Sequence, residues 1–201
     1  MHELEPSWAP PARSLDVAKQ QRLLMDKLST VDGIVAELAR EELGDIIELT
    51  GRINALQRRL GALAKAAAPS LLAMPGVGVL TAAKLVGESA GISRFKSEAA
   101  FARHAGIAPI PVWSGNTAGR VRLTRSGNRQ LNAAVHRIAV TQIRIDGLGK
   151  TYYEKKKSEG MSTPEALRCL KRRLARIVFN TLNTDHNSAN RAAGDQLPAA
   201  A

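Results

Sequence analysis

Apolar residues recur at helical spacing throughout the first third of the chain, and no proline interrupts residues 14–68. From Ile46 to Leu63 the apolar positions advance by alternating steps of three and four residues, which is the a/d pattern of a coiled coil. A longer step between Leu38 and Ile46 predicts a bend or break near residues 42–44. We therefore predict a long helix or a helical hairpin with coiled-coil character, and one face of an ordinary helical bundle is the alternative.

Helical periodicity also dominates the remainder of the chain, with one long exception. Helices are predicted over residues 97–104, from residue 129 to about residue 145, over residues 151–158 after a turn at residues 146–149, and from residue 163 to about residue 182. Residues 106–128 are rich in Gly, Pro, Ser and Arg and have no helical period, and only residues 109–124 carry a strand signal. A loop of this length inside a compact domain is generally functional or disordered. The predicted fold class is therefore mainly α.

These patterns divide the chain into four parts. Residues 1–13 contain three prolines and are predicted to be a disordered lead-in. The helical, coiled-coil-like segment covers residues 14–68, and a compact helical domain covers residues 69–183. Residues 184–201 are predicted to be a disordered tail.

Basic residues are concentrated in the second part of the chain. The 201 residues carry 29 Lys and Arg against 18 Asp and Glu, a formal net charge of +11. Residues 71–185 hold 19 of the basic residues and only 7 of the acidic ones, whereas residues 1–70 hold 9 and 10. Such an excess is typical of a protein with a polyanionic partner, and a solvated basic face is the alternative.

The composition also excludes several classes of protein. Hydrophobic residues make up 44% of the chain, which is enough for a folded core and argues against global disorder. Cys169 is the only cysteine and the four histidines lack zinc-site spacing, so neither a disulfide framework nor a thiolate or zinc site is expected. No apolar run is long enough for a membrane helix, and the N-terminus lacks a signal pattern. We expect a soluble intracellular protein.

The sequence Pro-Gly-Val-Gly at residues 75–78 stands between two apolar stretches. Two glycines allow a sharp turn and leave backbone N–H groups exposed at the start of the next helix, where the helix dipole also favours an anion. This pattern predicts a helix–hairpin–helix motif over residues 71–89 that contacts a nucleic-acid phosphate without reading sequence. A Pro-Gly turn between core helices is the alternative. The predicted contacts are Gly76, Val77, Gly78 and Lys84.

The long loop holds a serine that is followed by arginines. Ser114 precedes Gly115 in the middle of residues 106–128. A serine in such a setting is either an ordinary turn residue or a nucleophile that attacks a phosphodiester while guanidinium groups stabilise the developing charge. No P-loop, hydrolase triad or metal-ligand cluster accompanies it, so the residues alone leave both interpretations open. The basic residues that follow it are Arg120, Arg122, Arg125 and Arg129.

Five stretches of the chain, taken in order, resemble a single family. They are PGVGVLTAAKLVGE, SRFKSEAAFARHAGIAP, SGNTAGRVRLTRSGNRQLNAAVHRIA, YYEKKKSEG and ALRCLKRRLARIVFNTL. Together they resemble the C-terminal transposase domain of the insertion-sequence 110/116/902 family over about residues 68–183. Residues 14–67 resemble the helical segment that precedes this domain in the family.

The resemblance implies a function in DNA transposition and recombination. Ser114 corresponds to the family's catalytic serine, which forms a covalent link to a DNA phosphate. The family forms multimers and uses a structured guide RNA, so the expected partners are DNA, such an RNA and a second copy bound through residues 14–68. A bacterial, nucleoid-associated location in the cytoplasm follows, with no membrane partner. The motifs after the serine correspond to Gly119, Arg120, Gly127 and Asn128.

The resemblance also implies a part that these residues do not match. In the family, an RNase H-like N-terminal domain carries four acidic residues that bind Mg²⁺ and help to activate the serine. The acidic residues in the first 70 positions lie in a helical pattern instead. We therefore expect no cofactor in this chain, with Mg²⁺ held by an acidic domain supplied from elsewhere. Asn132 stands where the family often has arginine, which removes one phosphate contact and weakens nothing else. The expectation is a truncated or split transposase that binds DNA but does not cut it alone.

Two other classes of function stay open. One is a non-catalytic nucleic-acid-binding module built on the hairpin and on the basic last helix, with Lys171, Arg172, Arg173 and Arg176. The other is an oligomerisation remnant that assembles through the heptad helix. Strand exchange after addition of an acidic domain would favour the transposase, and poisoning of a full-length relative in mixed oligomers would favour the remnant.

Overall fold

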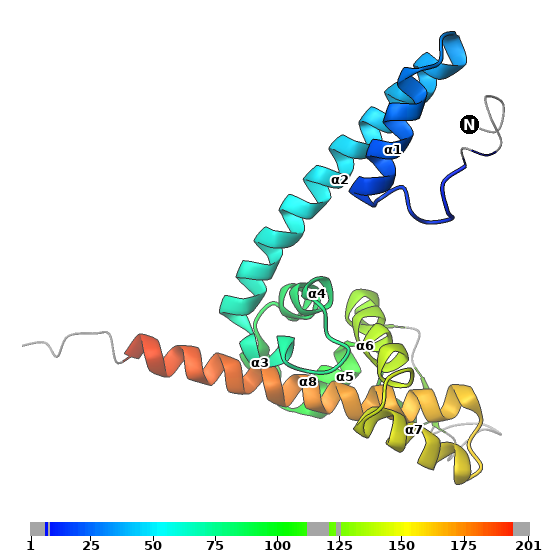
Figure 1. The fold of residues 1–201 in the computed structure, drawn as a ribbon. Coiled ribbons are helices and arrows are strands. Elements are labelled where there is room, and N and C mark those ends of the chain that lie inside the picture. Colours follow the sequence, from blue (N-terminus) through cyan, green and yellow to red (C-terminus); the bar gives the residue numbers. More distant parts are fainter. Residues whose placement is uncertain (1–6, 8, 112–120, 124–125, 195–201) are drawn as a thin grey trace, which may run out of the picture. The chain divides into compact units, whose positions relative to one another are not determined.

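The computed structural model describes residues 7, 9–111, 121–123 and 126–194 of the chain. Over these residues the fold is mainly helical, as predicted: helices account for every long element, and the strands are two segments of three residues each (Figure 1). The contacts divide the chain into two compact units, residues 1–59 and residues 60–201, and each unit is described by itself.

The first unit is a helical hairpin made by α1 (Ala18–Ser29) and α2 (Ile34–Ala67), whose last turns belong to the second unit. Leu24 and Leu28 of α1 are buried against Leu43 of α2. The Arg40 guanidinium of α2 donates hydrogen bonds of 2.7 and 2.9 Å to the carbonyls of Leu28 and Val31, which holds the connection between the two helices against α2. The predicted helical hairpin is therefore confirmed, although its first helix begins at Ala18 rather than at residue 14.

The predicted break near residues 42–44 is wrong, because α2 continues without interruption through this stretch. The chain reverses earlier, between Ser29 and Ile34, where Gly33 has a φ of +109°. A residue with a side chain rarely adopts such a φ, so glycine suits this corner. Leu38 is 55% exposed, so the longer apolar step before Ile46 does not mark a break in the packed face of α2.

The second unit is organised around its last helix, α8, which packs against α3, α5, α6 and α7, while α4 packs on α6 (Figure 1). Phe101, Leu131, Ile138 and Leu174 are fully buried between these helices. The short 3-10 helix η2 also contacts α8. The elements are α3 (Pro69–Leu72), α4 (Val79–Ser89), η2 (Ile92–Arg94), α5 (Glu98–His104), α6 (Arg129–Gln142), α7 (Leu148–Ser158) and α8 (Thr163–Gly194).

Two helix starts in this unit follow from capping side chains. The Ser97 hydroxyl accepts a hydrogen bond of 3.2 Å from the Ala100 N–H at the start of α5. The Asn128 side-chain oxygen accepts bonds of 2.9 and 3.0 Å from the N–H groups of Gln130 and Leu131 at the start of α6. Such caps satisfy N–H groups that the first turn of a helix leaves without a partner. Both predicted helix starts are therefore confirmed.

The predicted disordered tail is wrong for residues 184–194, because α8 continues to Gly194. Leu182 and Asp185 are each only 6% exposed, so this part of the helix packs on the second unit. The Asp185 carboxylate accepts a hydrogen bond of 3.3 Å from the Ser70 N–H at the start of α3. Asp185 lies beyond the apolar residues that predict the helix, and it connects α8 to the start of α3. Helical periodicity does not reveal such a long-range contact.

The long loop of the second unit begins and ends as a two-stranded antiparallel ribbon. Strand β1 (Pro109–Pro111) pairs with β2 (Val121–Leu123), with Pro109 opposite Leu123 and Pro111 opposite Val121. Of the segment 109–124 that carries the predicted strand signal, residues 109–111 and 121–123 are strands, and the residues between them lie outside the described part of the chain. Among the described helices, none combines the length and the apolar character that crossing a membrane requires.

Candidate nucleic-acid interface

The predicted site residues differ in how far the structure describes them. Ser114, Arg120 and Arg125 lie outside the described residues, as does Gly119, and Arg122 is described only as part of the backbone of β2. The remaining predicted residues are all described and lie on four elements. They are Gly76, Val77, Gly78, Lys84, Arg129, Lys171, Arg172 and Arg173.

The glycine turn, residues 75–78, joins α3 to α4. Gly76 has a φ of +82°, and a Cβ there would lie 3.3 Å from both the Ile138 carbonyl oxygen and the Thr141 Cβ of α6. Both the backbone conformation and the close packing therefore require glycine at this position. The Gln142 side-chain amide donates a hydrogen bond of 2.8 Å to the Pro75 carbonyl, which holds the turn against α6.

The second glycine of the turn has a different role from the one predicted. Gly78 has a φ of −92° and a ψ of 169°, an extended conformation that any residue adopts, and a Cβ there would meet no atom within 4 Å. The expectation that both glycines are needed for the turn is therefore wrong for Gly78. Gly78 is the N-cap of α4, and no side chain caps this helix. The first N–H groups of α4 thus lack a side-chain cap, which is the feature that the phosphate-binding prediction needs.

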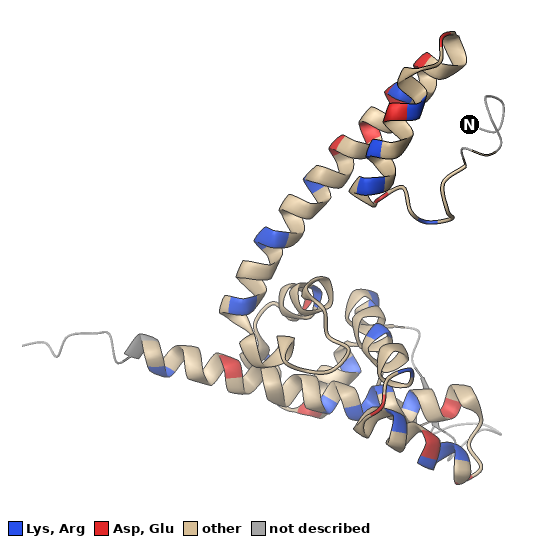
Figure 2. Ribbon diagram, viewed as in Figure 1, with Lys and Arg blue, Asp and Glu red and all other residues tan. Residues whose placement is uncertain are grey.

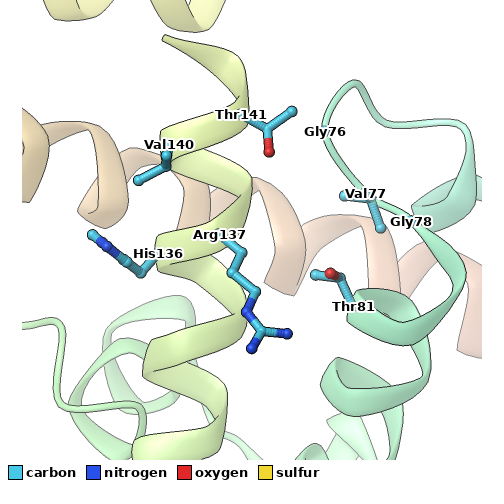
Figure 3. A pocket seen from close by; sticks show the side chains of 8 residues that line it. All are labelled: Gly76, Val77, Gly78, Thr81, His136, Arg137, Val140 and Thr141. Atoms are coloured by element: carbon cyan, nitrogen blue, oxygen red, sulfur yellow. The ribbon is translucent and has the colours of Figure 1, made fainter. Parts of the chain in front are cut away.

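A hollow of about 610 Å³ lies between the glycine turn and α6, and we call it the turn hollow. Figure 3 shows Arg137 and Thr141 extending from α6 toward the turn, with Thr81 of α4 opposite them. His136 also lines this hollow but extends to the other side of α6 in the same view. The predicted turn thus forms one wall of a cavity whose other wall, on α6, sequence analysis did not single out.

A second hollow, of about 580 Å³, lies where the long loop leaves and rejoins the helical core, and we call it the neck hollow. Gly106 and Gly127, at the two ends of the loop, touch through their backbones. A Cβ on Gly127 would lie 2.7 Å from the Gly106 nitrogen and 2.9 Å from the His104 carbonyl oxygen. The Asn128 N–H also donates a 2.7 Å hydrogen bond to the His104 carbonyl. These contacts bring the two ends of the loop together at one point.

Asn132 connects this neck to two helices. Its side-chain amide donates hydrogen bonds of 3.0 and 3.1 Å to the carbonyls of Ala105 and Gly106. Its side-chain oxygen accepts a 2.6 Å bond from the Lys171 ammonium of α8. The expectation that asparagine at this position only removes a phosphate contact is therefore incomplete, because Asn132 ties the start of the loop to α6 and α8.

Two basic groups close to the neck, Lys171 and His136, have lowered pKa values. Burial lowers the pKa of the half-buried Lys171. His136, which lines both hollows, has a lowered pKa because its imidazole is partly removed from water and, second, because the Lys171 charge is close. A histidine with a lowered pKa is predominantly neutral near pH 7, where one ring nitrogen donates a hydrogen bond and the other accepts one.

The structure brings together only some of the predicted basic residues. Lys84 of α4 donates a 2.7 Å hydrogen bond to the side chain of Gln130 on α6. Gln130 directly follows Arg129 in the sequence, so Lys84 lies near the start of α6, where Arg129 is. On α8, by contrast, Arg172 lies 3.8 Å from the Glu98 carboxylate, and the Arg173 guanidinium lies 4.7 Å from the centre of the Tyr152 ring. Figure 2 shows Lys and Arg positions on α6, α7 and α8, with some acidic positions among them on α7 and α8, and positions of both signs along α1 and α2.

The sequence analysis missed His136, Arg137 and Thr141. Part of the signal is present in the sequence, because Arg137 and Thr141 are four residues apart, about one helical turn, and share one side of α6, whereas His136 extends to the other side. That signal becomes informative only when α6 is known to pack on α4 beside the glycine turn.

The described residues offer no fit to the Mg²⁺ that the resemblance implies. No group of three or more His, Cys, Asp or Glu side chains able to hold a metal ion occurs within the described part of the chain. The site consists of donors and positive charges, which suit an anion. No chemical step through a metal ion is derived from these residues.

The geometry defines a helical, cationic domain with two hollows lined by hydrogen-bond donors, and comparison with known proteins identifies its class. Residues 68–154 match the model of the transposase IS116/IS110/IS902 family. Residues 68–154 belong to this family of insertion-sequence transposases, which confirms the resemblance found in the sequence.

Curated relatives of the chain are proteins of insertion elements. An uncharacterized 43.6 kDa protein of insertion element IS110 from Streptomyces coelicolor is 31% identical over 169 residues, which cover 83% of this chain and 41% of that protein. An uncharacterized 42 kDa protein of IS900 from Mycobacterium paratuberculosis is 30% identical, covering 87% and 43%. A 44.8 kDa protein of IS116 from Streptomyces clavuligerus is 27% identical, covering 85% and 42%. The chain thus spans about two fifths of the length of these relatives.

Proposed function

We propose that this chain is the DNA-binding part of an insertion-sequence transposase and acts in DNA transposition and recombination. The observation that carries the proposal is the uncapped start of α4 at Gly78, beside a hollow whose described lining contains Arg137 and His136 but no Asp or Glu. A phosphate of the DNA backbone suits this arrangement, because N–H groups at a helix start and positive side chains both stabilise an anion.

The binding that we propose is independent of DNA sequence. In this proposal the phosphates contact the backbone N–H groups at the start of α4 and the side chains of Lys84 and Arg129. Such contacts position a protein on DNA without reading bases. Gly78 contributes by having no side chain, so that a phosphate can approach the start of α4 closely.

The test is the affinity of the full chain for a fluorescein-labelled DNA duplex at several salt concentrations. If about six phosphates are neutralised, log K falls against log[salt] with a slope of about −5. Lys84→Ala is expected to weaken binding and reduce the slope by about 1. Arg52→Ala, on the exposed part of α2, removes the same charge in the first unit and serves as the matched control. An affinity that does not change with salt would contradict the electrostatic part of the proposal.

The proposed chemistry rests on the family resemblance alone. Ser114 is proposed to attack a DNA phosphorus through its hydroxyl oxygen, so that a Ser–O–P bond forms and the DNA oxygen leaves as a hydroxyl. Ser114→Ala in a full-length relative is expected to abolish strand transfer and to leave DNA affinity unchanged. We further propose that this chain binds DNA without cutting it until an acidic metal-binding domain is supplied, and Mg²⁺-dependent cleavage by the chain alone would contradict that.

A specific observation favours oligomerisation as a second function. Leu49, Ile53 and Leu56 of α2 are 52%, 60% and 55% exposed, although they belong to the predicted a/d seam. Three exposed apolar side chains on one helix face form a surface that a second copy of the helix would cover. We expect the wild-type chain to be a dimer or larger by light scattering, and Ile53→Lys to shift it toward the monomer. A monomeric wild-type chain would contradict this second function.

A further inference from the structure

We propose that the exposed face of α6 is a second phosphate-binding surface, which leads a DNA strand from the turn hollow to the neck hollow. This inference rests on the proposed DNA binding and adds His136, Arg137 and Thr141 to the interface. The face is defined by Arg129, Ala133, His136, Arg137 and Thr141, all of which are exposed.

The two hollows share a lining residue on α6. The turn hollow and the neck hollow are lined by different segments, but His136 lines both of them. Figure 3 shows the side chains of Arg137 and His136 leaving α6 on different sides, Arg137 toward the glycine turn and His136 away from it. Because consecutive residues of one helix thus serve the two hollows, a chain of phosphates can pass from one hollow to the other across α6.

The two arginines of this face lie well apart along α6. Arg129 and Arg137 are eight residues apart on α6, which corresponds to about 12 Å along the helix. Neighbouring phosphates of one DNA strand are about 3.4 Å apart along the duplex axis, so the distance of about 12 Å between the two positions exceeds this spacing. Arg129, at the neck hollow, and Arg137, at the turn hollow, can therefore contact different phosphates of the same strand.

The positive charges of Arg129 and Arg137 also favour the binding of a phosphate at this face. The guanidinium groups of Arg129 and Arg137 have no hydrogen-bond or ion-pair partner among the described residues, and neither hollow has an Asp or Glu in its described lining. The Glu88 carboxylate reaches the neck only through Asn128, whose side-chain amide donates a 2.8 Å hydrogen bond to it. No residue in the described part of the chain therefore competes with an anion for either arginine.

The basic residues of α8 are less available by the same measure. Arg176 pairs with Glu98 at 2.8 Å, and Arg172 lies 3.8 Å from the same carboxylate. Arg173 stacks on Tyr152. Binding a phosphate there would require these contacts to be given up, so the free charges on α6 are the better candidates.

The experiment compares single variants of the full chain for affinity to a fluorescein-labelled 25-base-pair DNA duplex and to an RNA duplex of the same sequence. Arg137→Ala is expected to weaken DNA binding about tenfold and to reduce the salt slope by about 1. His136→Ala is expected to weaken it less, because it removes one neutral donor, and His136→Gln, which keeps a donor, restores binding. Circular dichroism confirms that the variants remain folded.

The control is Arg144→Ala, which removes the same charge from an exposed position just beyond α6 that lines neither hollow. The inference is overturned if Arg137→Ala binds DNA as tightly as Arg144→Ala, or if the loss affects only the RNA duplex. If Lys84→Ala still weakens binding in that case, the proposed DNA-binding function stands and only the role of α6 is lost. If the wild-type chain does not bind the DNA duplex at all, the proposed function fails and the role of α6 fails with it.

Discussion

Gly127 is the position where the structure makes its sharpest prediction, because two strands of backbone touch there. Its φ is +113°, and a Cβ would lie 2.7 Å from the Gly106 nitrogen, 2.9 Å from the Gly106 Cα and 2.9 Å from the His104 carbonyl oxygen. All three are backbone atoms, which cannot move aside as the end of a flexible side chain can. We therefore expect Gly127→Ala to separate the two ends of the long loop.

The magnitude has two parts. A side chain at this φ costs about 1–3 kcal/mol in backbone strain. Forcing a methyl group into a packed site costs about another 1–3 kcal/mol. Gly127→Ala should therefore lower the free energy of unfolding by about 2–6 kcal/mol, which is a large part of the about 5–15 kcal/mol that holds a typical domain folded.

The assay is urea unfolding of the full chain followed by circular dichroism, and the chain offers a matched control. Gly160, just after α7, has a φ of +90°, but a Cβ there would meet no atom within 4 Å. Gly160→Ala therefore carries the backbone strain without the close contact, and it should cost only that strain, about 1–3 kcal/mol. If Gly127→Ala costs no more than Gly160→Ala, the two ends of the loop do not touch at Gly106, and the described neck is refuted.

Two further predictions concern the glycine turn and the neck. Gly76→Ala should destabilise the chain by about 1–2 kcal/mol from its positive φ, with a further cost from the contact of the methyl group with α6. Gly78→Ala should change stability little, because the entropy gain of about 0.4–1 kcal/mol is offset by alanine being a poorer N-cap than glycine. Equal unfolding midpoints for the two variants would contradict the assignment of different roles. Lys171→Met should raise the pKa of His136, because it removes a nearby positive charge, but leave it below the ordinary value, because burial persists. An NMR titration of the imidazole tests this, and an unchanged pKa would mean that the two groups do not interact.

The lowered pKa of His136 also has a consequence for stability. The folded state binds a proton at this site less readily than the unfolded state does, so this group favours folding above the unfolded pKa of about 6.5. The stabilisation of the folded state by neutral His136 is lost as the pH falls below about 6.5, and it is lost completely at pH values below the pKa of His136 in the folded state. Lys171→Met should make this loss smaller.

The sequence by itself determined the features that depend on neighbouring residues. The mainly α fold follows from apolar periodicity, and the starts of α5 and α6 follow from the capping side chains of Ser97 and Asn128. The strand signal of residues 109–124 and the family of the domain were also evident from the sequence. Periodicity, capping and motif order are local properties, so the sequence displays them directly.

Only the tertiary structure decided the features that depend on residues distant in the sequence. Helix α8 continues past residue 182 and packs there on the second unit, where Asp185 accepts a hydrogen bond from the N–H of Ser70, more than 100 residues earlier. Gly76 must be glycine because α6 packs on it, whereas Gly78 has open space and an ordinary φ. His136 and Arg137 became candidates for binding because folding placed α6 between the glycine turn and the neck of the loop. Contacts of this kind depend on how helices pack, and the periodicity of a single helix carries no information about which neighbour will cover each face.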